Sequence, residues 1–333
     1  MTETLAPVGW PVWDFEFWIL NLFVIWDLGF GICLRFMASI RQIFVRRKAV
    51  DSIARMTRTL EMISSARYKS YSGRWALTGD YRDALARIAF LLVSSEKPLE
   101  HPLLQENASG RTAILVIGSR KGLCGSYNSE IFRLLEVHVH QARTRGRTLD
   151  IYMPRGRLES TLTAHGLTPT KIYADLDEMP GDPQIRTIAD EFIDQYMSGT
   201  LDSLGIVYMR FYSASSQHAQ ALTILPLLEL VDDLATRAQV IWPWDLTFED
   251  FRTSPSAHTI VESLARMLMH YSIQSCFLDA ILSEHLARMV AMRSATENAE
   301  DMIKQLTADY NRARQSQITS ELLDIVSGMG TLE

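Results

Sequence analysis

Two long stretches of this chain, residues 32–72 and residues 256–327, contain neither glycine nor proline. Glycine and proline are the strongest interrupters of regular structure, and most of them lie instead within residues 98–255. Uninterrupted runs of this length exceed an ordinary globular helix and are typical of coiled coils. The sequence therefore predicts one long helix near each end of the chain and a compact domain between them.

In the C-terminal run, residues recur every seven positions along two neighbouring stripes. The first stripe is Val261, Leu268, Ser275, Leu282, Met289, Thr296, Ile303 and Tyr310, and the second is Leu264, Tyr271, Leu278, His285, Met292, Ala299, Leu306 and Ala313. Thirteen of these sixteen residues are apolar, which predicts a sustained coiled-coil seam. A helix of about 70 residues is roughly 100 Å long, so we expect much of it to protrude or to lie inside another protein. Ser254 and Pro255 are expected to begin this helix and Gly328 to end it.

The N-terminal run is less regular. An apolar stripe that could pack against the C-terminal seam is formed by Ile43, Val50, Ile53, Leu60 and Ile63. The rest of the run is rich in basic residues, namely Arg41, Arg46, Arg47, Lys48, Arg55, Arg58, Arg67 and Lys69. These residues form either a solvated helix face or a surface for an acidic partner. After Gly73 the pattern predicts a second helical stretch over residues 80–94.

The middle of the chain reads as an α/β domain. The stretches suited to strands are Ala113–Ile117, Leu149–Met153, Ile206–Phe211 and Ala221–Leu225, and helical patterns cover Glu130–Arg145 and Ile185–Tyr196. Strands that alternate with helices indicate a small, partly parallel sheet. Residues 172–202 are acidic, and we expect them at the surface.

The first 36 residues stand apart from this plan. They hold four of the seven tryptophans, and residues 17–26 are almost wholly apolar. That run is too short to span a bilayer, and extending it to Phe36 includes Asn21, Asp27 and Arg35. No basic region precedes it, so it lacks the form of a secretory signal peptide. Three readings stay open: a start codon assigned too early, an interfacial amphipathic segment, or a true membrane span.

Charge and motif spacing exclude several functions. The net charge of −6 argues against binding driven by nucleic-acid phosphates. Cys33, Cys124 and Cys276 lie far apart in the sequence, so neither a disulfide framework nor a CxxC metal pair is predicted. His138 and His140 are two positions apart on a helix and point to different faces. We find no combination of nucleophile, base and oxyanion donors, so catalysis by this chain alone is not expected.

The glycine-rich segment Gly118–Gly125 follows a predicted strand and opens a helix, the position of many phosphate-binding loops. Its spacing fits neither GxGxxG nor GxxxxGK[ST], so we interpret it as a tight strand-to-helix turn. Cys124 within it is either a reactive thiol or, as is commoner for a lone cysteine beside a strand end, a packed side chain. His285, on the heptad seam, is interpreted as a packed or hydrogen-bonded core residue.

Two segments near the C-terminus point to a family. Residues 283–299 read SEHLARMVAMRSATENA, and residues 310–326 read YNRARQSQITSELLDIV. Together they closely resemble the C-terminal signature of the γ subunit of F-type ATP synthases. Residues 122–128 resemble the GLCGGYN turn of that family, residues 37–41 its usual start and residues 56–63 its ITKAMKMV segment. The resemblance covers residues 37–333.

The resemblance implies a fold that agrees with the pattern: a long antiparallel coiled coil of the N- and C-terminal helices, with an inserted α/β, Rossmann-like domain. The implied boundaries are residues 1–36 for an N-terminal extension, 37–96 for the N-terminal shaft helix and the helix after it, 97–253 for the α/β domain and linker, and 254–333 for the C-terminal shaft helix. A membrane-associated coiled-coil adaptor is the alternative, and it would make residues 1–36 essential.

The implied function is that of the central rotor shaft, which couples ion flow through the membrane ring to ATP synthesis or hydrolysis. The implied partners are the α and β subunits of the hexamer, the ε subunit and the ring of c subunits, with no nucleic acid. The chain itself would bind no cofactor, because ATP, ADP and Mg²⁺ belong to the partner subunits. Its implied place is peripheral, on the cytoplasmic face of the bacterial plasma membrane.

The resemblance also implies contact residues. Those expected to meet the catch loops of a β subunit are Arg314, Gln315, Thr319, Leu60 and Met62. Those expected at the foot, near ε and the c ring, are Arg120, Lys121, Gly122, Cys124 and Tyr127. The family usually has Asp-Arg before the glycine turn, whereas this chain has Arg120 and Lys121, and its usual FEP segment reads Phe248-Glu249-Asp250 here.

Overall fold

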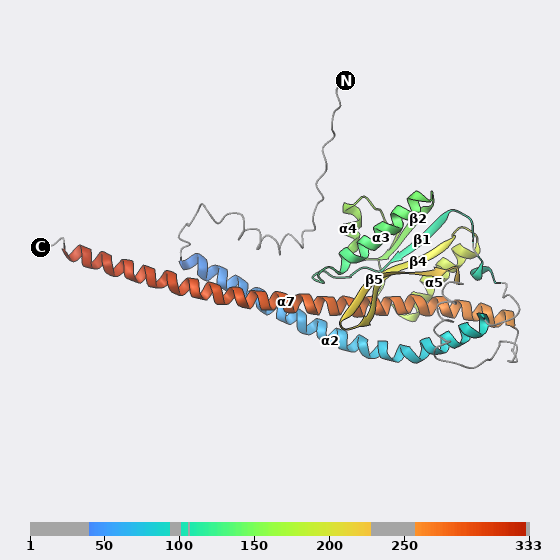
Figure 1. The fold of residues 1–333 in the computed structure, drawn as a ribbon, viewed down its shortest axis with the longest axis horizontal. Coiled ribbons are helices and arrows are strands. Elements are labelled where there is room, and N and C mark those ends of the chain that lie inside the picture. The colour runs from blue at the N-terminus through green and yellow to red at the C-terminus, as the bar shows by residue number, and fades with distance from the viewer. Residues whose placement is uncertain (1–39, 94–100, 106, 228–256, 331–333) are drawn as a thin grey trace, which may run out of the picture. The chain divides into compact units, whose positions relative to one another are not determined.

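The computed structural model describes residues 40–93, 101–105, 107–227 and 257–330 (Figure 1). Contacts divide them into two units. The helical unit holds the described residues up to Arg58 together with those from Arg293 onward, and the sheet unit holds the described residues from Thr59 to Met292. None of the helices in these described stretches is long and apolar enough to cross a membrane.

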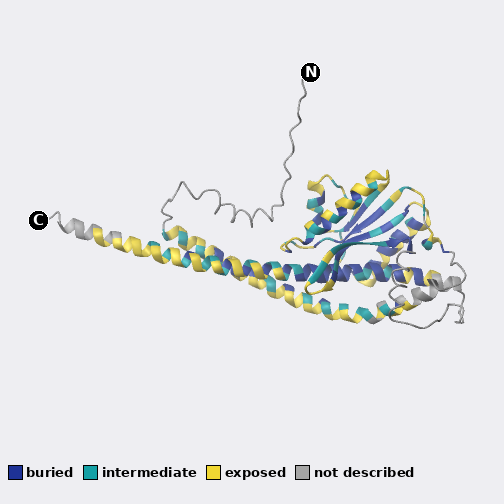
Figure 2. Ribbon diagram, viewed as in Figure 1, coloured by how far each residue is buried: buried dark blue, intermediate teal, exposed yellow. Residues whose placement is uncertain are grey.

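The prediction of one long helix near each end is confirmed. Helix α2 spans Ile40–Val93 and helix α7 spans Ala257–Gly330. Along α7 none of the described members of the two predicted heptad stripes is exposed. In the sheet unit burial extends beyond the stripes, for example to Ile273, Phe277 and Ile281, and dark blue in Figure 2 follows this part of α7. The heptad period therefore placed its own residues correctly but identified only part of the buried surface of the helix.

Two predicted helix boundaries differ from the structure. We expected a break at Gly73 and a separate helix over residues 80–94, but α2 continues through Gly73 and Gly79 without interruption. Each helical glycine costs about 1 kcal/mol relative to alanine. Packing by Tyr71, Trp75 and the residues around them outweighs that cost. Gly328 was expected to end α7, which instead runs two residues further, to Gly330.

Other predicted features fall on residues that the structure does not describe. Ser254 and Pro255, the expected start of the C-terminal helix, lie outside the described residues, as do residues 1–36 and the family-like start at residues 37–39. The readings of these segments stay predictions.

In the helical unit, α2 and α7 pair in antiparallel fashion. The Thr57 hydroxyl lies 2.7 Å from that of Thr296, and the ring of Phe44 lies 6.4 Å from that of Tyr310. Residues earlier in α2 therefore lie beside residues later in α7, as in an antiparallel pair. A small apolar cluster completes this pairing and consists of Val50, Ala54, Ala299 and Leu306, with Ile43, Met302 and Ile303 packed against it.

The predicted apolar stripe of α2 is partly wrong. Val50 is buried, but Ile53 is 46% exposed and Ile63 is 54% exposed. Besides Leu85, the buried positions described in this helix are Val50, Ala54, Thr57, Ser64 and Tyr71, which alternate in steps of three, four and seven as a heptad seam does. Three of these positions carry small or hydroxyl-bearing side chains, so a search for large apolar residues found Val50 but replaced the others with exposed neighbours such as Ile53 and Ile63.

The sheet unit contains a five-stranded sheet in the order β3-β2-β1-β4-β5. Strands β1 (Arg111–Val116), β2 (Thr148–Pro154), β3 (Lys171–Tyr173) and β4 (Ser203–Ser213) pair in parallel, and β5 (Ser216–Leu225) is antiparallel to β4. The four predicted strands correspond to β1, β2, β4 and β5. The three-residue strand β3 was missed because it is too short to carry a pattern.

Helices cover both faces of this sheet. Helices α3 (Tyr127–Thr144) and α4 (Leu158–Ala164) pack against the face that presents Ile114 and Val116. Helix α5 (Asp182–Met197) and the N-terminal part of α7 pack against the face that presents Ala113 and Leu115. A short 3₁₀ helix, η1 (Pro102–Leu104), precedes β1. The arrangement is the predicted α/β domain between two long helices.

The expectation that residues 172–202 lie at the surface holds for most of this segment but is wrong for the inner side of its helix. Helix α5 lies within it and buries Ile185, Ile188, Phe192, Ile193 and Tyr196. The acidic residues lie on the other, solvated side of the helix. The acidic composition of the segment therefore predicted only that side correctly.

Candidate functional site

The glycine-rich segment forms the predicted turn between β1 and α3. Leu123 has φ +65° and Gly125 has φ +60°. Glycine adopts this left-handed region without penalty, whereas a leucine there is unusual. The Leu123 side chain is 50% exposed, so the turn projects an apolar side chain from a backbone conformation that leucine disfavours.

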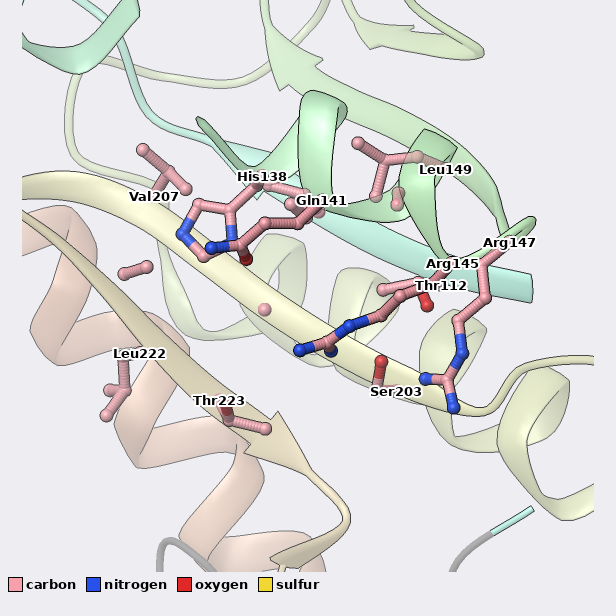
Figure 3. A pocket seen from close by; sticks show the side chains of 14 residues that line it. Thr112, His138, Gln141, Arg145, Arg147, Leu149, Ser203, Val207, Leu222 and Thr223 are labelled. Atoms are coloured by element: carbon pink, nitrogen blue, oxygen red, sulfur yellow. The ribbon is translucent and has the colours of Figure 1, made fainter. Parts of the chain in front are cut away.

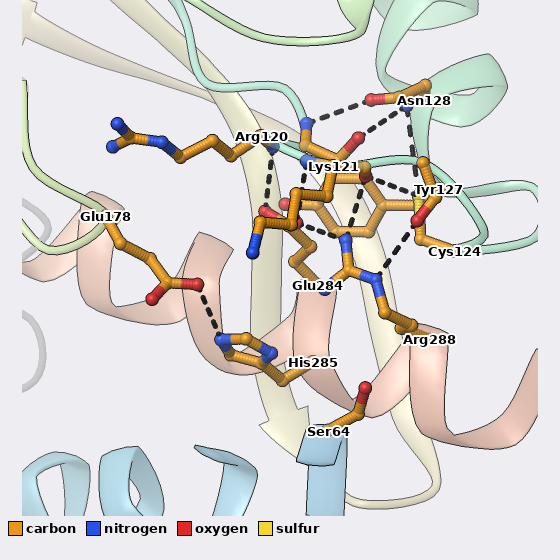
Figure 4. Close-up of polar contacts among 12 residues, drawn as sticks. Ser64, Arg120, Lys121, Cys124, Tyr127, Asn128, Glu178, Glu284, His285 and Arg288 are labelled. Carbon is orange, nitrogen blue, oxygen red and sulfur yellow. Dashed lines mark hydrogen bonds and ion pairs between the residues drawn. The ribbon is translucent and has the colours of Figure 1, made fainter. Parts of the chain in front are cut away.

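Two charged residues of α7 hold this turn in place (Figure 4). The Glu284 carboxylate accepts hydrogen bonds from the backbone N–H groups of Arg120 at 3.1 Å and Lys121 at 3.3 Å. The Arg288 guanidinium donates to the backbone carbonyls of Gly122 at 3.1 Å and Lys121 at 2.8 Å. Glu284 and Arg288 also pair with each other. We refer to these two residues as the turn anchor.

The turn anchor is buried, with side chains only 8% and 7% exposed for Glu284 and Arg288. A buried ion pair is stable only when further hydrogen bonds satisfy its remaining donors and acceptors. Here the backbone of the turn supplies them. The ion pair therefore depends on the turn having this conformation, and the turn is itself held by the ion pair. Together these contacts fix the turn to α7.

The residues around the anchor are packed rather than reactive. Cys124 is 1% exposed, so of its two interpretations the structure supports the packed side chain. The Tyr127 hydroxyl donates to the backbone carbonyl of Ala280 at 2.9 Å, and burial raises the pKa of Tyr127. Asn128 donates to the Ser119 hydroxyl at 2.7 Å and accepts from its N–H at 2.9 Å. The segment thus attaches α3 to α7.

A second contact fixes the start of the same turn. The backbone carbonyl of Ser119 accepts a hydrogen bond from the N–H of Arg157 at 2.9 Å. A Cβ on the neighbouring Gly156 would lie 2.5 Å from that carbonyl oxygen. Glycine is required at position 156 because the chain approaches the backbone of the turn too closely for any side chain.

We therefore expect Gly156→Ala to lower the free energy of unfolding by about 1–3 kcal/mol, the usual cost of forcing extra volume into a packed site. Urea denaturation of the full chain measures this. Gly79→Ala is the control: no atom lies within 4 Å of a Cβ there, and alanine should stabilise the helix by about 0.5–1 kcal/mol. Equal effects of the two substitutions would show that the close approach is not a constraint.

His285 lies one residue from the anchor and faces α2. Its ring stacks on Tyr71 with centroids 5.6 Å apart, as expected for a packed core residue. The Nε2 atom lies 3.1 Å from a carboxylate oxygen of Glu178, but the two groups are not aligned as a hydrogen bond. Burial lowers the pKa of His285, and the neighbouring Glu178 only partly opposes this.

The structure brings together the five residues expected at the foot, because Arg120, Lys121, Gly122, Cys124 and Tyr127 all belong to the anchored turn or the first residue of α3. Arg120 and Lys121 are exposed, and the Arg120 side chain donates to the backbone carbonyl of Leu176 at 2.7 Å. Which partner this surface meets stays a prediction.

The residues expected to contact β catch loops are distributed over both units. Arg314, Gln315 and Thr319 lie on α7 in the helical unit and are exposed. Leu60 and Met62 lie on α2 in the sheet unit; Leu60 is half-buried and Met62 is 61% exposed. Their contacts with a partner also stay predictions.

The role of the turn anchor was not predicted from the sequence. Glu284 and Arg288 stand four positions apart on one helix, a spacing that brings opposite charges together. Both lie next to positions of the heptad seam, where charge is normally excluded. A charged pair beside a seam was the available signal. In the described residues we find no group of three or more histidine, cysteine, aspartate or glutamate side chains placed to hold a metal ion.

Comparisons with known proteins agree with this geometry. A family model described as ATP synthase matches residues 39–332. The chain is 35% identical to the ATP synthase gamma chain of Rhodopirellula baltica, over 89% of this chain and 100% of that one. It is 29% identical to the ATP synthase gamma chain of Leptospira biflexa, over 88% of this chain and 98% of that one.

Solved structures resemble the fold. A chain of the mitochondrial ATP synthase of Euglena gracilis, in a structure of OSCP, F1 and c-ring, matches with a TM-score of 0.58 and 16% identity, over 88% of this chain and 94% of that one. A chain from the rotor of the same enzyme matches with a TM-score of 0.54 and 15% identity, over 84% and 98%. At this level of identity the likeness concerns the fold.

Proposed function

The chain belongs to the gamma-chain family of ATP synthases, and from this membership we propose that it acts as the central rotor shaft of an F-type enzyme. In this role it couples ion flow through the membrane ring to ATP synthesis or hydrolysis in the α/β hexamer. The proposal assigns mechanical coupling, not nucleotide chemistry, to this chain.

The observation that carries the proposal is the antiparallel pairing of α2 and α7 in the helical unit. Its seam is a small cluster built on Val50, Ala54, Ala299 and Leu306, whereas other large apolar side chains of this unit stay exposed: Phe44 is 45% exposed, Leu322 58% and Leu323 61%. Exposed apolar groups in such numbers are typical of surfaces that another protein covers. A shaft enclosed by a hexamer requires this distribution.

The anchored turn supports the same role. A shaft must transmit torque between its paired helices and its globular part, so the two cannot be joined by a loose loop. In the sheet unit the turn anchor ties the sheet to α7 through charged hydrogen bonds, which are stronger than neutral ones. A rigid attachment of this kind suits a coupling element.

We assign the finer details as proposals. The partners are the α and β subunits, the ε subunit and the c-subunit ring. The chain binds no cofactor and carries no catalytic site, so that ATP, ADP and Mg²⁺ are held by the partner subunits. Its place is peripheral, on the cytoplasmic face of a bacterial plasma membrane or an equivalent energy-coupling membrane.

The test of the function is copurification. Tagged full-length chain expressed with its α and β subunits should purify as a complex that hydrolyses ATP, and ATP-driven rotation of a probe attached to the chain should be visible. A chain that purifies alone, or a complex whose hydrolysis leaves the probe stationary, contradicts the shaft role.

We expect a chain that starts at Met37 to assemble with its partners and to support coupled ATPase as well as the full chain does. The reason is that residues 37–41 resemble the family start, and the family model matches residues 39–332. Assembly yield and ATP-driven ion pumping into vesicles measure the outcome. The coiled-coil adaptor alternative requires residues 1–36, so loss of assembly on truncation would favour the adaptor.

The position of the glycine turn in the complex needs a different reporter from Cys124, which is buried. Leu123→Cys places a thiol at a half-exposed position. If the turn lies at the foot, a flexible thiol crosslinker on this variant should capture ε or c. Capture of α or β instead would move the turn from the foot to the hexamer.

A further inference from the structure

A cavity of about 250 Å³ lies on the α3 side of the sheet, between the C-terminal end of α3 and strands β4 and β5 (Figure 3). Thr112, the second residue of β1, and Ser203, the first residue of β4, line it. The glycine turn follows the opposite end of β1. The cavity is therefore separate from the anchored turn, and neither the shaft role nor any contact proposed above makes use of it.

The lining is polar at one end and apolar in the middle. Arg145 and Arg147 lie at the polar end, and Figure 3 draws Ser203 between their guanidinium groups. The hydroxyl groups of Thr112 and Thr223 line the cavity as well. Its floor is formed by Ile114 and Val207, which are buried. A few convergent polar groups over an apolar floor are the usual make-up of a small-molecule site.

The positive charge at this end is only partly offset within the described part of the chain. Arg145 and Arg147 make no side-chain hydrogen bond or ion pair with any described residue. The carboxylate of Asp202 is close enough to feel the charge of Arg147. That carboxylate is already occupied by the Ser109 hydroxyl and the Gly110 N–H, each at 2.7 Å. Both guanidinium groups belong to exposed side chains, and their hydrogen-bond donors beside the hydroxyl groups are suited to an anion.

A glycine in the middle of β4 provides independent support. Gly205 lines the cavity, and a Cβ there would meet only Ile114 at 3.8 Å and the Leu222 carbonyl at 3.9 Å, which are ordinary contacts. The pairing with β5 shifts register beside Gly205, but its φ is not left-handed, so the irregularity does not demand glycine. Glycine inside a strand often marks close approach by a ligand. At this position it keeps the cavity open.

The far end of the cavity offers a neutral polar pair. Gln141 is exposed and His138 is half-buried, both from α3. Burial lowers the pKa of His138, so its ring is neutral at pH 7 and can donate one hydrogen bond and accept another. The site therefore combines a cationic end, an apolar middle and a neutral hydrogen-bonding end.

We propose that this cavity binds a phosphate monoester with a small, largely apolar body. The two guanidinium groups would take the phosphate oxygens, with Ser203 and Thr112 as further donors, and the body would lie over Gly205. A volume of about 250 Å³ is below the roughly 300–1,000 Å³ of pockets for drug-sized ligands. A ligand of around ten non-hydrogen atoms fits, whereas a nucleoside triphosphate does not.

Phenyl phosphate is the probe, titrated into the full-length chain by isothermal calorimetry. We expect one site per chain, binding at least about fivefold weaker for inorganic phosphate and no binding for phenol. Gly205→Val should abolish binding while leaving the urea unfolding midpoint unchanged or higher, because valine is favoured in strands. If the valine variant fails to fold, Gly205→Ala provides the smaller block and should weaken binding several-fold.

Matched charge changes complete the test. Arg145→Gln removes a charge that lines the cavity, and Arg143→Gln removes one that lies two positions away and does not line it. We expect about fivefold to tenfold weaker binding for the first and no more than twofold for the second, since a specific charged contact outweighs a general field. Equal effects of the two, binding unaffected by Gly205→Val, or no heat with phenyl phosphate at millimolar concentration would each overturn the proposal.

Discussion

Arg288→Ala is expected to lower the free energy of unfolding of the sheet unit by about 3–5 kcal/mol, the cost of breaking a buried ion pair by removing one partner. The substitution leaves the Glu284 carboxylate buried without its counter-charge. It also removes the donors to the carbonyls of Lys121 and Gly122. Denaturation of the full chain, followed by the fluorescence of its tryptophans, measures the loss.

The control for this prediction lies one helical turn further along α7. Arg293 and Glu297 also stand four positions apart and approach to 3.2 Å, but their side chains are 70% and 64% exposed. Arg293→Ala should cost no more than about 0.5 kcal/mol. A double variant of Glu284→Gln and Arg288→Met should recover part of the loss, because the uncompensated charge is gone. Similar losses for Arg288→Ala and Arg293→Ala would mean that the turn does not depend on the anchor.

The parts of the fold that were predictable are those governed by one dominant periodicity. The heptad of α7 placed Leu268, Leu282 and Leu306 on the buried side, because a helix that packs along its length must repeat its apolar residues every seven positions. The buried strands of the sheet were predictable for a similar reason: strands covered on both faces read as short apolar runs.

The partner seam on α2 was not predictable in this way. Ala54, Thr57 and Ser64 are buried, yet none is a large apolar residue. Close approach of two helices favours small side chains, and the hydroxyl of Thr57 is satisfied by Thr296 and by backbone carbonyls one turn earlier. The pattern of one helix alone cannot show that these residues suit a seam, because their fit depends on the helix that they face.

The candidate site was predictable only in part. The sequence located the glycine turn and identified it correctly as a strand-to-helix connection. What stabilises that turn comes from Glu284 and Arg288, which follow it by more than 150 positions in the sequence. Gly156 is constrained by Ser119 in the same long-range manner. Contacts of this kind depend on the tertiary fold: the charged pair beside the seam of α7 marks the anchor, but nothing in the sequence near it identifies the turn as its partner.

Arg314→Ala is expected to reduce coupled ATP hydrolysis and synthesis by about tenfold without altering the helicity of the chain. Arg314 and Gln315 occupy the Arg-Gln of the segment that, by resemblance, grips a catch loop of a β subunit. Arg314 is exposed on α7 in the helical unit, where its planar fork can meet a carboxylate. A charged hydrogen bond shielded by a partner contributes about 1.5–3 kcal/mol, and each 1.4 kcal/mol is about a tenfold change in population.

The control is Arg312→Ala, which removes the same charge from the same helix. Arg312 is also exposed, but a displacement of two positions turns its side chain to a different face of the helix. A contact made in only one rotary state shifts the population of that state, so Arg314→Ala should slow turnover at a single dwell of the rotation cycle, while Arg312→Ala should leave every dwell unchanged. Even an ion pair contributes less than about 1 kcal/mol to stability when it stays exposed to solvent, so the loss of a solvated arginine should have little effect. Equal and small effects of the two substitutions on dwell times, turnover and assembly would therefore assign Arg314 to the solvated flank of the coiled coil.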